Sequence, residues 1–106
     1  QSRERTARYT KADWAQVKAE QLAVGQAFVA ALQAGAPATS EAAMDAAEAH
    51  RRSIQRFYDC SYAMHRGLAD MYITDPRFTK TYEDMAAGLA AYVRDAIHAN
   101  ADRHEA

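Results

Sequence analysis

The sequence has one cysteine, no secretory signal pattern and no long apolar run, and each absence removes a class of protein. A single thiol in 106 residues cannot form an internal disulfide, which favours a reducing setting. No apolar run approaches the ~20 residues that a membrane-spanning helix needs, and no charged and apolar leader pattern is seen. We therefore expect a cytoplasmic chain with no membrane partner.

A strong excess of charge is absent too. The formal net charge is −1 and the pI is about 6.5, so the chain has no positive field to attract a phosphate backbone. We expect no direct nucleic-acid contact by this segment. Because the sequence does not begin with methionine, we also expect a missing part upstream of Gln1.

Prolines number only two and β-branched residues form few runs, which favours helices throughout. Hydrophobic residues make up 49% of the chain, enough for one core in a chain of this length. We expect an all-α fold of about five helices in a compact, globin-like arrangement. Residues 1–9 have no apolar stripe, so we expect them to be a partly mobile segment ahead of a folded domain, residues 10–106.

Capping residues set the expected helix boundaries. The first two predicted helices run from Lys11 after the cap Thr10, and from Glu41 to Phe57 after a cap at Thr39 or Ser40. The others run from Cys60 to Ile73 after Asp59, from Pro76 to Met85 after the cap Asp75, and from Leu89 until the chain frays at Asn100. Gly25 lies inside the first of these helices. Glycine weakens a helix interior, so its presence there favours a close crossing or a kink.

Cys60 admits two interpretations. A thiol in the first turn of a helix feels the partial positive charge of the N-terminus, which lowers its pKa and favours the reactive thiolate. Cysteine is also among the most often buried residues and commonly packs as a small hydrophobe. His65 lies five positions along the same predicted helix and points elsewhere, so the residues do not predict a Cys/His hydrolase.

The histidines show no ligand spacing. His50, His65, His98 and His104 form neither an HxxxH pair nor a set with further cysteines, so we expect no metal site. A haem held by His50 or His98 is conceivable in a helical pocket, but a lone histidine on an apolar face is more often a hydrogen-bonded core residue. No cofactor is expected. Tyrosines and methionines on the third helix suit either a core or a pocket for a bulky, semi-polar ligand.

Five segments together resemble one known family. They are YTKADW (Tyr9 to Trp14), EAAMDAAEAHR (Glu41 to Arg51), YDCSYAMH (Tyr58 to His65), MYITDPRFT (Met71 to Thr79) and GLAAYVRDAIHANA (Gly88 to Ala101). In order and spacing they are similar to the thiopeptide-recognition domain of the TipA type, over nearly the whole chain. Each segment alone is weak evidence, whereas the ordered set is specific.

The resemblance implies a function for Cys60. Family members are the effector parts of MerR-type, drug-induced transcriptional activators, with an all-helical, globin-like fold. The cysteine of their YDC motif adds to a dehydroalanine of thiopeptide antibiotics such as thiostrepton, and Cys60 holds that position. Such capture is stoichiometric, so the chain is not expected to be an enzyme and has no catalytic residue. Any dimerisation of the parent is expected through the missing N-terminal part.

Two residues depart from the best-known member of the family. Ser61 follows the cysteine where that member has glycine, and Gly67 replaces a second cysteine, so any role of a second thiol is lost. The region upstream of Gln1, which becomes ordered on drug binding in the family, is also absent. Residues 1–13 would then form only part of a ligand-induced lid.

The expected site combines this resemblance with the helical faces. Cys60 is the expected covalent attachment point for the thiopeptide. Pocket walls are inferred from the apolar stripes as Trp14, His50, Phe57, Tyr62, Met64, Leu68 and Met71. The alternative function is a non-covalent multidrug or stress-sensing effector domain in which Cys60 only packs.

Overall fold

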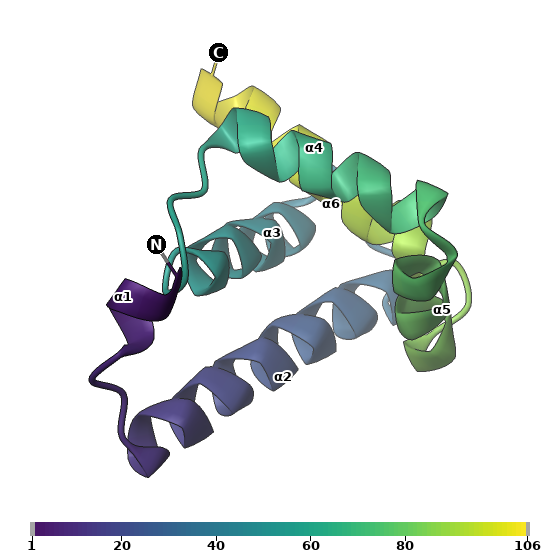
Figure 1. Cartoon of the computed structure of the whole chain (residues 1–106). Coiled ribbons are helices and arrows are strands. Elements are labelled where there is room, and N and C mark those ends of the chain that lie inside the picture. The colour runs from purple at the N-terminus through teal and green to yellow at the C-terminus, as the bar shows by residue number, and fades with distance from the viewer. Residues whose placement is uncertain (1, 106) are drawn as a thin grey trace.

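Six helices make up a computed structural model that describes residues 2–105 (Figure 1). They are α1 (Ser2–Thr6), α2 (Lys11–Gln33), α3 (Glu41–Ile54), α4 (Tyr62–Thr74), α5 (Pro76–Met85) and α6 (Leu89–Glu105). The all-α prediction is confirmed, with α1 added to the five expected helices. Gln1, the first residue of the expected mobile segment, and Ala106, the last residue of the expected domain, lie outside the described residues.

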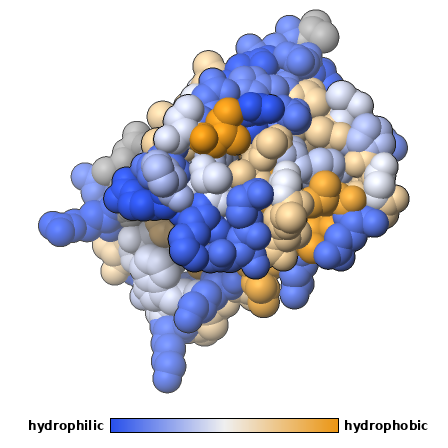
Figure 2. All heavy atoms as spheres, turned by 90° about the vertical axis from the view of Figure 1, so that its right-hand side faces the viewer, coloured by the Kyte–Doolittle hydropathy of each residue, from blue (hydrophilic) through white to orange (hydrophobic). Residues whose placement is uncertain are grey.

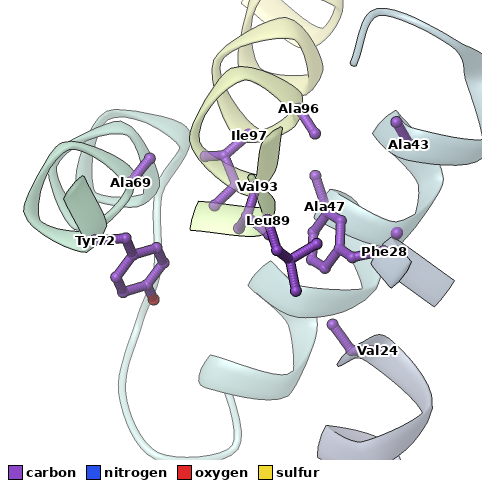
Figure 3. Packing of buried hydrophobic residues seen from close by; sticks show 11 residues of the cluster. Val24, Phe28, Ala43, Ala47, Ala69, Tyr72, Leu89, Val93, Ala96 and Ile97 are labelled. Carbon is purple, nitrogen blue, oxygen red and sulfur yellow. The ribbon is translucent and has the colours of Figure 1, made fainter. Parts of the chain in front are cut away.

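Helix α6 lies at the centre of the packing. It contacts α4 and α3 most extensively, while α2 packs against α3 and α5 joins α4 to α6 (Figure 1). Its Leu89, Val93 and Ile97 are fully buried and meet Phe28 of α2 and Tyr72 of α4 in one cluster (Figure 3). Alanines from α3, α4 and α6 fill the remaining core positions, which lets the helix backbones approach closely.

Most helix starts follow the predicted caps. Thr10 and Asp13 form a capping box at the start of α2, Ser40 accepts a hydrogen bond from the Ala43 amide, and Asp75 caps α5 with Pro76 in its first turn. Gly35 follows α2 with φ of 75°, a conformation that glycine adopts without strain.

Three predicted boundaries are wrong. Helix α3 ends at Ile54 rather than Phe57, because the amides of Phe57 and Tyr58 both turn back to the Ile54 carbonyl. Helix α4 begins at Tyr62 with Ser61 as its N-cap, so Asp59 is not the cap and Cys60 precedes the helix. Helix α6 does not fray at Asn100 but continues to Glu105.

The continuation of α6 has a clear cause. Asn100 and Ala101 are fully buried, and the Asn100 amide donates a 3.0 Å hydrogen bond to Glu48 of α3. Arg103 in turn donates to the Asn100 side-chain oxygen at 2.8 Å. A buried polar group with its partners in place stabilises the last turns that a polar sequence alone would leave frayed.

None of the described helices is long and apolar enough to cross a membrane. On the face shown in Figure 2, hydrophobic side chains lie in small separate groups among hydrophilic ones.

Glu48 is the most buried carboxylate of the described residues. Burial alone would raise its pKa, but hydrogen bonds from Arg51 and Asn100 and the Arg51 charge lower the pKa to about 2. The Arg51 guanidinium binds both carboxylate oxygens, at 3.2 and 2.7 Å. A carboxyl group with a depressed pKa stabilises the folded state. The stabilisation is fully present above pH 4.5, the ordinary pKa of the group, and is lost as pH falls toward 2.

Replacing Glu48 with glutamine tests this contribution. Because Arg51 would lose its buried partner, we expect the free energy of unfolding at pH 7 to fall by roughly 3 kcal/mol. The difference from wild type should shrink as pH falls from 4.5 toward 2, because over this range Glu48 binds a proton in the unfolded chain before it does so in the folded one. Urea unfolding at several pH values measures both effects. Asp84→Asn, which breaks only an exposed pair with Lys80, is the control, and an equal loss in the two variants would contradict the account.

Candidate functional site

A cleft of about 450 Å³ opens between α2, α3 and α5. Its walls come from α2, from α3 and the segment after it, from Tyr72 of α4 and from α5. The lining residues are Gln21, Val24, Gly25, Phe28, His50, Ser53, Ile54, Phe57, Tyr58, Tyr72, Phe78, Thr81, Tyr82 and Met85. None of them has a permanently charged side chain, so the cleft favours a neutral ligand with aromatic or apolar surface.

Tyr72 is the hub of the aromatic wall. Its ring centroid lies 5.1 Å from that of Tyr82, 5.6 Å from Phe78 and 5.9 Å from His50. Burial raises the pKa of Tyr72 and raises that of Tyr82 to about 12. Both phenols therefore stay neutral at physiological pH and can serve as hydrogen-bond donors to a ligand.

Gly25 gives the cleft part of its width. A Cβ atom at this position would lie 2.8 Å from the Met85 Cε atom. The neighbour is the flexible end of the Met85 side chain of α5 and not a helix backbone, so the close helix crossing or kink predicted at Gly25 stays a prediction. A larger side chain at position 25 would have to displace Met85 and occupy space that the cleft now holds.

The structure brings together only part of the predicted pocket. His50 and Phe57 line the cleft. Trp14 is 45% exposed and lines an adjoining groove with Phe57, at a ring distance of 6.2 Å. Since Phe57 and Gln21 line both hollows, the groove beside Trp14 adjoins the cleft, and Trp14 lies outside the cleft itself.

Four predicted wall residues lie away from the cleft. Tyr62 stacks on His104 of α6 at 4.7 Å and lies under the Arg51 guanidinium. Met64 is 44% exposed, Leu68 packs against the core, and Met71 is partly buried outside the lining. Their roles as ligand contacts remain predictions that the cleft does not support.

Sequence reasoning missed twelve of the fourteen lining residues, and for five of these a signal was present in the sequence. Phe78 and Tyr82 are one helical turn apart on α5, an aromatic pair that the sequence already places on one face. Tyr58 and Tyr72 flank the Met-containing stripe of α4, and Met85 ends α5. What the sequence did not indicate is that α5 faces α2 across the cleft.

Cys60 is fully buried and does not line the cleft. Burial raises the pKa of its thiol, the nearby Arg51 charge lowers it and Glu48 raises it, with a net increase. The helix-dipole argument for a low pKa is therefore wrong in this state, because Cys60 precedes α4 instead of standing in its first turn. A charged Cys60 thiolate would raise the pKa of the Tyr72 phenol, so the sulfur lies near Tyr72.

Hydrogen bonds hold the segment that carries the thiol. Arg51 donates to the Cys60 carbonyl at 2.8 Å, and the Cys60 amide donates to the Gln55 side chain at 3.3 Å. Arg5 of α1 donates to the Gln55 carbonyl at 2.7 Å and pairs with Asp59. The described residues contain no group of three or more His, Cys, Asp or Glu placed to hold a metal ion.

Comparison with known proteins places this arrangement in a family. The model of the TipAS antibiotic-recognition domain matches residues 1–100. The chain is 54% identical over 105 residues to the HTH-type transcriptional activator TipA of Streptomyces coelicolor, covering 98% of this chain and 42% of that protein. The chain belongs to the TipAS antibiotic-recognition domain family.

Other matches extend the comparison beyond Streptomyces. The HTH-type transcriptional activator mta of Bacillus subtilis is 35% identical over 106 residues, which are 99% of this chain and 40% of that relative. This TipAS-family chain thus spans less than half the length of the curated relatives that it matches.

Two solved structures share the TipAS-family fold. One is TipAS of Streptomyces lividans in complex with nosiheptide, with a TM-score of 0.86 and 51% identity over 100% of this chain and 75% of that chain. The other is the antibiotic binding domain of a TipA-class multidrug resistance transcriptional regulator, with a TM-score of 0.76 and 49% identity over 85% of this chain and 97% of that one.

Burial of the thiol predicts slow chemical labelling. We expect a thiol-specific probe such as iodoacetamide to modify Cys60 in the native protein at least tenfold more slowly than in the urea-unfolded chain, since burial both blocks access and disfavours the thiolate. Mass spectrometry over time measures both rates. Equal rates in the native and unfolded chain would show that the thiol is open.

Proposed function

We propose that this chain is the ligand-binding part of a drug-responsive transcriptional activator in the cytoplasm and that it captures thiopeptide antibiotics. The observation that carries the proposal is the uncharged aromatic cleft between α2, α3 and α5, in a fold that matches the TipAS–nosiheptide complex. DNA contact and dimerisation are assigned to other parts of the parent activator.

The chemistry of the cleft fits such a ligand. Large macrocycles with planar rings bury apolar surface against aromatic side chains and gain from offset or edge-on ring contacts. A volume of about 450 Å³ takes part of such a macrocycle, while the adjoining groove beside Trp14 extends the contact surface. Tyr72 and Tyr82 add neutral hydroxyls for orientation.

Cys60 is proposed as the covalent anchor. The thiol loses its proton, the sulfur forms a bond to the terminal carbon of a dehydroalanine, and the alkene π electrons take a proton at the neighbouring carbon. No leaving group and no oxidant are needed. A cleft that holds the macrocycle raises the effective concentration of the alkene near the sulfur, which accelerates the addition without a general base.

The addition requires the Cys60 segment to move. The thiol is fully buried, but residues 55–61 are not helical. A few hydrogen bonds hold them: Arg51 and Arg5 donate to backbone carbonyls, and the Gln55 side chain accepts from the Cys60 amide. We propose that ligand entering beside Tyr58 and Tyr72 displaces this segment. Part of the free energy of ligand binding then drives the movement that exposes the thiol.

Burial also favours the second candidate function. A fully buried thiol with a raised pKa suits a domain that binds drugs without covalent attachment and uses Cys60 only for packing. This chain would then be a non-covalent multidrug or stress-sensing effector domain.

Intact-protein mass spectrometry separates the two functions. After mixing with thiostrepton, we expect wild-type protein to gain one drug mass and Cys60→Ser to gain none, because only the thiol adds to the alkene. Isothermal titration of both proteins provides the control for binding. Binding by wild type without any mass gain would exclude the covalent step and favour the second candidate.

A cleft-filling variant tests where the ligand binds. Gly25→Leu should weaken nosiheptide binding at least tenfold, because its side chain meets Met85 and fills the cleft. Gly67→Leu is the matched control, since nothing lies within 4 Å of a Cβ at that helical glycine of α4. Calorimetric titration gives both affinities, and thermal unfolding verifies that both variants fold. Equal affinities for the two folded variants would place the ligand elsewhere.

A further inference from the structure

His50 and His65 form a pair behind the aromatic wall of the cleft. The Nδ1 atom of His50 lies 2.8 Å from the Nε2 atom of His65. The ring centroids are 5.1 Å apart and the ring planes differ by 24°, so the two rings meet edge to edge, as a hydrogen bond between ring nitrogens requires. His65 is fully buried, whereas His50 lines the cleft. One proton lies between the two nitrogens, and its position decides what His50 presents to a ligand.

The outer nitrogens of the pair differ in their surroundings. Among the described residues, the Nδ1 atom of His65 is the one buried side-chain nitrogen or oxygen without a hydrogen-bond partner. The Nε2 atom of His50 makes no hydrogen bond within the described part of the chain either, but it is not among the buried unpaired atoms. It therefore remains accessible, and the accessible space beside His50 is the cleft.

Two proton arrangements satisfy the short contact. If His50 donates from Nδ1, His65 must carry its own proton on Nδ1, which leaves a buried N–H without an acceptor. If His65 donates from Nε2, its Nδ1 atom keeps only an unpaired lone pair. Orphaned buried N–H groups are the rarer and costlier case. Neutral imidazole in water also favours the form with the proton on Nε2, which the second arrangement gives both rings.

We propose that His65 fixes His50 in the tautomer protonated on Nε2, so that His50 presents a neutral N–H donor to the cleft and selects ligands with an exposed acceptor on a planar ring or amide. The proposal rests on ligand binding in the cleft, as put forward above. His50 is then a specificity-determining residue, and His65 is a positioning residue that does not touch the ligand.

The surroundings keep the pair neutral. Burial lowers the pKa of His50 to about 4, and burial together with His50 lowers that of His65 to about 3. Phe28 and Tyr72 contact the His50 ring edge-on, which limits its rotation. A fixed donor among aromatic rings discriminates strongly, because a ligand without an acceptor would leave the N–H unpaired once water is expelled.

Nitrogen NMR of the free protein tests the tautomer directly. In ¹⁵N-labelled protein at pH 7, we expect both histidines to show an unprotonated Nδ1 and a protonated Nε2. His65→Gln keeps an amide donor that can reach the His50 Nδ1 atom, so His50 should stay protonated on Nε2. His65→Phe removes the donor, so His50 should populate both tautomers. A protonated Nδ1 on His50 in wild type would overturn the proposal.

A matched pair of small probes tests the selectivity. Thiazole has a ring nitrogen acceptor, and thiophene has the same shape without it. We expect thiazole to shift the His50 Nε2–H signal and to bind about fivefold more tightly than thiophene, the effect of one hydrogen bond, with the difference lost in His65→Phe. Equal effects of the two probes on wild type would overturn the proposal.

Nosiheptide then separates this proposal from the proposed function. We expect His65→Phe to bind nosiheptide about fivefold more weakly and His65→Gln to restore most of the affinity. His104 stands beside Tyr62 and is not a lining residue of the cleft, so His104→Phe should bind like wild type. If wild type does not bind nosiheptide but still binds thiazole more tightly than thiophene, the proposed thiopeptide function is wrong and the proposal of a His50 donor is upheld. If nosiheptide binds equally to wild type and to all three variants, the proposal of a His50 donor is wrong and the proposed thiopeptide function is upheld.

Discussion

The ion pair between Glu48 and Arg51 links α3 to α6 and to the segment that carries Cys60. Glu48 accepts hydrogen bonds from Arg51 and from the buried Asn100 of α6, which ties α3 to the central helix. Arg51 extends the same network to the Cys60 carbonyl. A pair this deeply placed stabilises the fold only because its hydrogen bonds are satisfied, and removal of one partner leaves a costly buried charge. The pair thus fixes both the α3–α6 contact and the position of the thiol.

If Cys60 captures the ligand covalently, as proposed, the thiol must be protected in the free chain and exposed in the complex. A free thiol exposed in a cell is open to oxidation and to unrelated electrophiles. In the unliganded chain, burial protects the Cys60 sulfur and raises its pKa. The non-helical segment that carries it also contributes Phe57 and Tyr58 to the cleft lining. A ligand that fits the cleft is therefore positioned to disturb the segment, whereas a small electrophile in solution is not.

The sequence predicted the starts of helices better than their ends. Thr10, Ser40 and Asp75 act through local hydrogen bonds that any neighbouring residues would allow. The extension of α6 past Asn100 depends on Glu48, 52 positions away, and no local pattern shows it. Similarly, the core face of α4 consists of His65, Ala69 and Tyr72. The more apolar Met64 seemed a better candidate and is exposed.

The same difference between local patterns and long-range packing explains which site residues the sequence predicted. His50 was found because it lies on the inward face of α3, which local periodicity indicates. Phe57 was found by extending the same periodicity, although it lies three residues beyond the end of the helix. The α5 wall was missed because its position depends on the packing of α5 against α4 and α6. Assignment of Cys60 to the first turn of a helix also started the predicted stripe in the wrong place, which drew Met64 and Leu68 into the expected pocket.

The most direct test of the account is to map nosiheptide contacts on the ¹⁵N-labelled chain by NMR chemical-shift changes. The account predicts that the largest changes cluster on Phe28, Tyr72 and Tyr82 around the cleft and extend to the segment that carries Cys60. Changes centred instead on Tyr62, Met64 and His104, on the α4–α6 side away from the cleft, would contradict it.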